Sequence, residues 1–259
     1  MTMMGCGEVT ERPLTTHPTI VSLNPCADAI LAEVSAPGQL LAISHYSHDP
    51  AASSMPQNVA ARFPATGGTA EEVLALAPDM VVASSFLAPA TRAALIRGGV
   101  RVETVGITST LEESLAQVRQ LGKIAGEPQR AEMLAERIEA AWTEAAFAGP
   151  KVNTLLWQEG GIVPGEGSLA AAMLEHSGFA LQSAARGLGQ GAYLPLEQVL
   201  ADPPELVLAS GDDPMLTHPV LLQVRGMDYR QFDSALLYCG GPTIIRALVR
   251  LRAIRAEVG

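Results

Sequence analysis

One stretch of fourteen residues occurs twice in the chain: EEVLALAPDMVVAS at residues 71–84 and EQVLADPPELVLAS at residues 197–210. The copies lie 126 residues apart (197 − 71), and eight of the fourteen positions are identical. In each copy a proline stops a run with helical spacing, and an apolar run typical of a buried strand follows. Internal repetition on this scale predicts two related lobes.

Strand and helix patterns alternate around the first copy. Apolar, β-branched runs at residues 19–23, 40–43, 80–83 and 102–105 predict buried strands, and helical patterns separate them. This rhythm indicates an α/β fold with a parallel sheet in each lobe. We place a tail at residues 1–18, one lobe at 19–109, two helices at 110–148 and the second lobe at 149–259.

Composition excludes several classes of protein. The chain has 259 residues, of which 48% are hydrophobic, so it can bury a core and is not disordered. The formal net charge of −10 argues against nucleic-acid binding, which requires clustered Lys and Arg. No apolar stretch is long enough to span a membrane. The three cysteines form no CxxC pair, so a structural zinc site is not expected.

Further motifs follow one another over residues 19–256. They are IVSLNPCAD at 20–28, GG at 67–68, LALAPDMVV at 74–82, PGEGS at 164–168, LEQVL at 196–200 and CGGP at 239–242. Their order and spacing resemble those of the periplasmic substrate-binding proteins of iron-siderophore and cobalamin ABC importers, the type in which a rigid helix joins two lobes.

The resemblance implies a fold and a set of partners. It implies a connecting helix near residues 111–126 that limits lobe movement, and a ligand in the cleft between the lobes. The ligand would be a metal chelate, either a ferric siderophore or a cobalamin-like corrinoid, delivered unchanged to an ABC permease dimer in the inner membrane. Glu71 and Glu197 would each dock one lobe on that permease. We expect a periplasmic monomer that has no cofactor and is not an enzyme.

Ligands of open α/β sheets sit at the carboxyl ends of strands, which selects the loops after the predicted strands. Aromatic residues make up only 4% of the chain, and several fall in these loops. Flat apolar rings suit a large planar chelate or corrin. Alternatively, Trp157 and Phe86 cap the sheets as part of the core. The predicted ligand-binding residues are Asn24, Pro25, Cys26, His45, Tyr46, Phe86, Trp157, Tyr193 and Asp212.

Two alternative functions stay open. His45, His48 and Asp49 offer nitrogen and oxygen ligands, which would suit a receptor for a bare divalent metal ion. Three ligands in one short loop rarely complete a site, so we favour a polar loop and predict no metal site. Cys26 at a helix start, with His45 or His48 as base, would suit an α/β enzyme. The chain has no nucleophile elbow and no phosphate-binding loop.

The cysteines raise two further questions. MMGC at residues 3–6 resembles the end of a bacterial lipoprotein signal, which would make Cys6 a lipidation site. The apolar stretch that should precede it is missing, so the signal peptide is absent or truncated, and a chance cysteine is the alternative. For Cys26 and Cys239 we expect two free thiols. A disulfide is the alternative, and it would require Cα atoms within about 7 Å.

Overall fold

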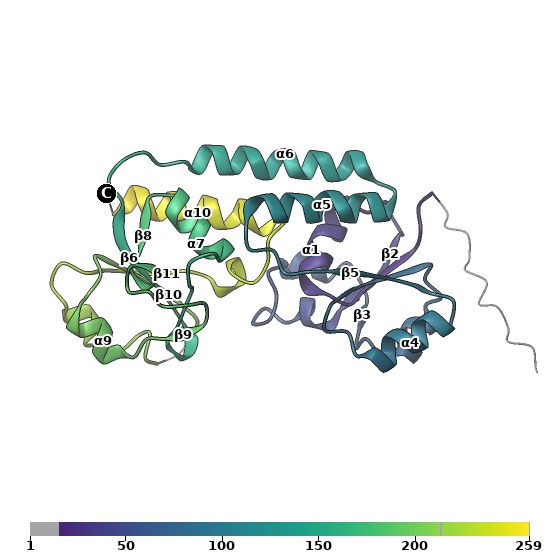
Figure 1. Cartoon of the computed structure of the whole chain (residues 1–259), viewed down its shortest axis with the longest axis horizontal. Coiled ribbons are helices and arrows are strands. Elements are labelled where there is room, and N and C mark those ends of the chain that lie inside the picture. Colours follow the sequence, from purple (N-terminus) through teal and green to yellow (C-terminus); the bar gives the residue numbers. More distant parts are fainter. Residues whose placement is uncertain (1–15, 213, 259) are drawn as a thin grey trace, which may run out of the picture. The chain divides into compact units, whose positions relative to one another are not determined.

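The computed structural model describes residues 16–212 and 214–258. The chain divides into two compact units. The first comprises the described residues up to Ile107 together with residues 119–132, and the second comprises residues 108–118 and those from Met133 on. Helices α5 (Leu111–Ala125) and α6 (Pro128–Ala145) therefore contribute residues to both units (Figure 1).

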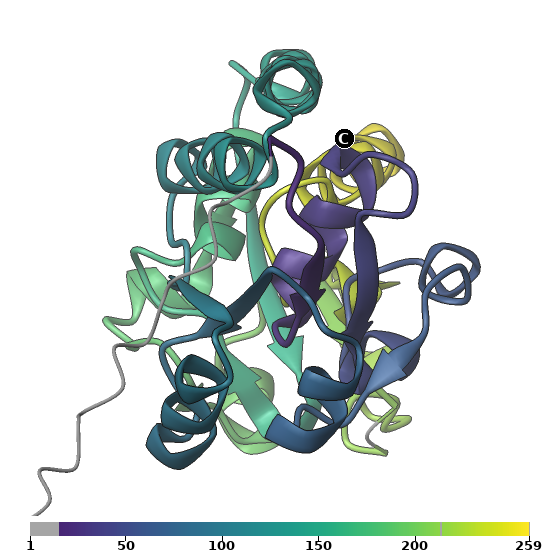
Figure 2. The ribbon, with the colours of Figure 1, turned by 90° about the vertical axis from the view of Figure 1, so that its right-hand side faces the viewer.

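The described part of the first unit holds a parallel sheet with the strand order β3-β2-β1-β4-β5. The central strand β1 pairs with β2 on one side and with β4 on the other. Both β1 and β4 are buried along nearly their whole length, which explains their continuous apolar sequences. The parallel sheet expected for this unit is confirmed. Its strands, purple to blue in Figure 2, are β1 (Ile20–Ser22), β2 (Leu40–Ser44), β3 (Ala65–Thr66), β4 (Met80–Ser84) and β5 (Arg101–Val105).

Helix α1 (Pro25–Val34) begins where the sequence supplies a cap. Asn24 caps α1, because its side-chain Oδ1 accepts hydrogen bonds from the backbone N–H groups of Cys26 and Ala27, at 2.8 and 3.2 Å. Pro25 occupies the first helical position, where no N–H is needed. The helical segments are α1 (Pro25–Val34), the 3₁₀ turn η1 (His45–His48), α2 (Gln57–Ala60), α3 (Ala70–Ala75) and α4 (Pro89–Arg97).

The sheet of the second unit is mixed, which differs from the parallel sheet expected there. Strand β6 pairs in parallel with β10 and β8, but the short strands β7 and β9 run antiparallel. The sequence does not indicate β7 and β9, because two residues are too few to show any periodicity. The strands are β6 (Val152–Gln158), β7 (Ile162–Val163), β8 (Phe179–Leu181), β9 (Ala192–Tyr193), β10 (Leu206–Ser210) and β11 (Asp228–Gln231).

The core of the second unit includes Trp157, Leu155 and Val207. Helical segments connect or follow the strands of this unit. They are α7 (Leu169–His176), α8 (Gln182–Ala185), α9 (Leu196–Ala201) and α10 (Thr243–Glu257), with 3₁₀ turns η2 (Glu159–Gly161), η3 (Leu221–Gln223) and η4 (Ser234–Leu236). No helix within the described ranges combines the length and apolar character that crossing a membrane requires.

The structure confirms the internal repeat. Helix α3 and strand β4 begin at residues 70 and 80, and their counterparts α9 and β10 begin at 196 and 206, both 126 residues later. The last residues of the two helices are also 126 positions apart, and so are the last residues of the two strands. In both units the repeated strand continues the sheet by parallel pairing, β4 with β5 and β10 with β11. The same helix–strand unit is therefore built twice.

Candidate functional site

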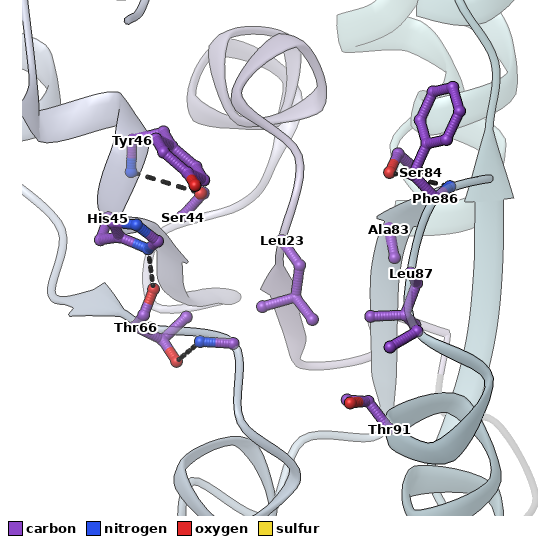
Figure 3. Close-up of a pocket in the computed structure, with 13 residues that line it drawn as sticks. Leu23, Ser44, His45, Tyr46, Thr66, Ala83, Ser84, Phe86, Leu87 and Thr91 are labelled. Atoms are coloured by element: carbon purple, nitrogen blue, oxygen red, sulfur yellow. Dashed lines mark hydrogen bonds between the residues drawn. The ribbon is translucent and has the colours of Figure 1, made fainter.

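A pocket of about 260 Å³ opens in the first unit at the carboxyl ends of its strands (Figure 3). Its lining includes Leu23, Ser44, Thr66 and Ser84, which end or directly follow β1, β2, β3 and β4. The chain order reverses between β1 and β4, so the pocket includes the topological switch point of the sheet. Open α/β sheets bind ligands at such a point.

His45 and Tyr46 form one side of the pocket. They begin the turn η1, and the backbone N–H of Tyr46 donates to Ser44 Oγ at 3.4 Å. Their rings lie 4.1 Å apart between centroids, with an interplanar angle of 35°. His45 Nδ1 lies 3.3 Å from the carbonyl oxygen of Thr66. Because Tyr46 is 53% exposed, the pair contributes aromatic surface to the lining of the pocket.

Phe86 and Leu87 lie on the opposite side, with Leu23 between the two sides (Figure 3). Phe86 is 81% exposed, which is unusual for so large an apolar ring. Its backbone N–H donates to Ser84 Oγ at 3.2 Å, so the end of β4 holds its main chain. The pocket thus combines exposed aromatic surface with hydroxyl groups, which suits a ligand that carries both an apolar face and polar groups.

The loop after β3 is held by Glu72, a residue that the sequence analysis did not select. Glu72 Oε2 accepts hydrogen bonds from the backbone N–H of Gly67 at 2.7 Å and from Thr66 Oγ1 at 3.0 Å. The N–H of Glu72 donates to Thr69 Oγ1 at 3.2 Å, which caps α3. A Thr followed three residues later by Glu is the pattern of a capping box, so the sequence contained a usable indication.

A buried carboxylate lies behind the His45–Tyr46 turn. Asp28 on α1 has no exposed surface, and its Oδ2 accepts from the N–H of Ser44 at 2.9 Å and from Ser47 Oγ at 2.6 Å. Burial raises the pKa of Asp28 to about 7, while the nearby Ser22 hydroxyl and the hydrogen bonds from Ser47 and Ser44 oppose that rise. No pattern in the sequence singles out Asp28.

Of the predicted ligand-binding residues, the pocket brings together His45, Tyr46 and Phe86. Asn24 and Pro25 have a local role at the start of α1, and their contact with a ligand stays a prediction. Tyr193 is 61% exposed on β9, and Asp212 is exposed after β10. Ligand contact by these two residues also stays a prediction.

The prediction that Trp157 contacts the ligand is wrong. Its side chain is wholly buried in the core of the second unit, and its Nε1 donates to the carbonyl oxygen of Leu194 at 3.0 Å. The physical reason is that β6 runs on to Gln158, so Trp157 lies inside the strand rather than in the loop after it. The alternative that Trp157 belongs to the core is confirmed.

The expectation of free thiols at Cys26 and Cys239 is also wrong, because both residues are disulfide-bonded. The sequence does not give the distance between the two Cα atoms. The requirement that they lie within about 7 Å could therefore not decide between free thiols and a disulfide. A disulfide sulfur is not a thiolate, which removes the nucleophile that the enzyme alternative needs. Cys6 lies outside the described residues.

His48 and Asp49 follow the aromatic pair in and just after η1. Within the part of the chain that the structure describes, no group of three or more His, Cys, Asp or Glu side chains is placed to hold a metal ion. Glu71 and Glu197 are both exposed, and each is the second residue of its helix, α3 or α9.

The chain belongs to the periplasmic binding protein family, whose profile matches residues 20–237. Members of this family are solute-binding proteins, which agrees with the resemblance noted from the motifs. No curated protein matches the chain.

Solved structures of three periplasmic proteins share the fold. The periplasmic heme-binding protein RhuT from Roseiflexus sp. RS-1 is 22% identical, with 93% of this chain and 99% of that chain covered and a TM-score of 0.71. The heme-binding protein HutB of Vibrio cholerae is 19% identical, with coverages of 93% and 99% and a TM-score of 0.75. The vitamin B12 binding protein BtuF of Vibrio cholerae is 20% identical, with coverages of 93% and 97% and a TM-score of 0.67.

Proposed function

We propose that this chain is the substrate-binding protein of an ABC importer and captures a metal chelate. The candidate ligands are cobalamin-like corrinoids, haem and ferric siderophores. The observation that supports this most strongly is the pair of aromatic groups on opposite sides of the pocket, His45 with Tyr46 and Phe86. Haem and vitamin B12 are the ligands named for the three structural relatives described above.

The chemistry of the pocket fits binding without reaction. Exposed rings stack on a planar ligand, and the hydroxyl groups of Ser44, Thr66 and Ser84 supply a few polar contacts for orientation. Binding of this kind releases the ligand unchanged. In this proposal the protein works in the periplasm as a monomer, either free or anchored by a lipid on Cys6.

Aromatic substitutions test the site. Tyr46→Ala and Phe86→Ala should each weaken binding of the best chelate by about tenfold, since a lost aromatic contact costs up to roughly 1.4 kcal/mol. Tyr46→Phe keeps the ring and should bind within about threefold of the wild type. Ile96→Ala removes a 47% exposed apolar side chain from α4 and serves as the control. Isothermal titration calorimetry measures all four variants, and unchanged binding in both alanine variants at the pocket would overturn the assignment.

A second part of the proposal concerns the permease. Glu71 and Glu197 are equivalent by the repeat, exposed, and located one in each unit. Two equivalent carboxylates suit a two-fold symmetric partner that carries cationic side chains. Their position in the first turn of a helix is also favoured by the helix dipole, so only an uptake experiment separates the two roles.

A further inference from the structure

Asp28 holds both ends of the segment that carries the aromatic pair. Its Oδ2 accepts one hydrogen bond from the backbone N–H of Ser44, the residue before His45, and one from Ser47 Oγ, the residue after Tyr46. Asp28, Ser44 and Ser47 are all buried. A single oxygen therefore fixes the turn at a point on each side of the two exposed rings.

Asp28 lies in the first turn of α1, but the capping of that helix does not require it. Asn24 already caps that helix through the N–H groups of Cys26 and Ala27, and the N–H of Asp28 itself donates to the Asn24 carbonyl at 2.9 Å. Asp28 Oδ1 is buried without a hydrogen-bond partner among the described residues. Burying such an oxygen is costly, so the side chain is not explained by the stability of α1 alone.

We infer that Asp28 is a positioning residue for the ligand, which keeps His45 and Tyr46 in the geometry that the chelate meets. The inference rests on the proposed function and names a residue outside the pocket lining on which that function depends. Ordering two side chains before the ligand arrives removes an entropic cost from binding. Loss of Asp28 therefore weakens binding without removing any group that touches the ligand.

Asp79 provides a matched control in the same unit. Its Oδ2 accepts from the backbone N–H and from Oγ1 of Thr19, both at 2.9 Å, so it too satisfies one N–H and one hydroxyl. It lies just before β4, at the amino end of the sheet, whereas the pocket lies at the carboxyl ends. Asp28→Ala and Asp79→Ala thus remove the same kinds of hydrogen bond at opposite ends of one sheet.

The experiment combines calorimetry with haemin and cyanocobalamin and ¹⁹F NMR of 3-fluorotyrosine-labelled protein. The Tyr46 resonance is assigned with Tyr46→Phe. We expect Asp28→Ala to bind about tenfold more weakly and to shift or broaden the Tyr46 resonance. Asp79→Ala should change neither readout. Asp28→Asn keeps an acceptor oxygen and should restore binding to within about threefold. If Asp28→Ala does not fold, Ser47→Ala removes one of the two bonds and is measured instead.

The outcomes separate the two proposals. A wild-type protein that binds neither probe counts against the proposed ligand, and the Tyr46 resonance then tests the positioning role without any ligand. The positioning role is overturned if Asp28→Ala, or Ser47→Ala in its place, leaves the Tyr46 resonance and the affinity unchanged. It is also overturned if Asp79→Ala changes the Tyr46 resonance and the affinity as much as Asp28→Ala does.

Discussion

Asp28 shows how one buried group links stability to pH. Burial raises its pKa from 3.8 to about 7, so between these values the folded chain holds a proton that the unfolded chain has lost. The folded state binds more protons in this window, and its stability therefore falls as pH rises through it. Below pH 3.8 and above about pH 7 the contribution of Asp28 does not vary with pH.

Urea unfolding at several pH values measures this effect. Between pH 5 and pH 6.5, the unfolding free energy of the wild type should fall relative to that of Asp28→Asn by about 1 kcal/mol per pH unit. The asparagine does not titrate, while the other carboxyl groups and histidines are present in both proteins and cancel in the difference. Parallel pH profiles for the two proteins would show that Asp28 is ionised in the folded state throughout.

At the scale of elements, the loop after β3 depends on the helix that follows it. Glu72→Ala removes the acceptor for Gly67 N–H and Thr66 Oγ1 and should lower the unfolding free energy by about 1 kcal/mol. Because this loop lines the pocket, binding of the chelate should weaken as well. Glu71→Ala, at the neighbouring exposed position, should leave binding unchanged and lower the unfolding free energy by only about 0.3 kcal/mol, its share of the helix-dipole interaction. Thermal unfolding and calorimetry on the two variants check this, and an equal loss of stability and of binding in both would exclude a specific role for Glu72.

Elements with strong local patterns could be predicted from the sequence. The repeated helix and strand were correctly placed, because periodicity and the proline break are properties of consecutive residues. Strands β7 and β9 were missed, since their pairing depends on contacts between residues 162–163 and 192–193 that no local pattern encodes. Trp157 was expected in the loop after a strand, but strand β6 continues to Gln158 and so includes it.

The candidate site was predictable only in part. His45, Tyr46 and Phe86 follow strands, and the rule for open α/β sheets selects such positions. Asp28 gave no such indication, because an acidic residue within an apolar helix usually marks the solvent side. Its place inside depends on hydrogen bonds to Ser44 and Ser47, sixteen and nineteen residues away.

For the whole molecule, the repeat leads to a prediction about delivery. Replacing both Glu71 and Glu197 by Arg should abolish uptake of the chelate in cells, because the new positive charges would repel the cationic side chains of the permease. Binding of the chelate to the purified protein should stay unchanged. Glu112→Arg is the control, since Glu112 is an exposed second residue of α5 and lies outside the repeat. Full uptake by the double variant, or a loss of ligand binding, would refute the docking role.

The central claim is that the molecule binds a metal chelate rather than a bare ion. Calorimetric titration of the purified wild-type protein with cyanocobalamin, haemin, a ferric siderophore and the chlorides of zinc and manganese tests it most directly. We predict saturable binding of at least one chelate with a Kd of about 1 µM or tighter, and no comparable heat from either bare ion. Binding of a bare ion more tightly than every chelate, or no binding of any chelate, would contradict the account.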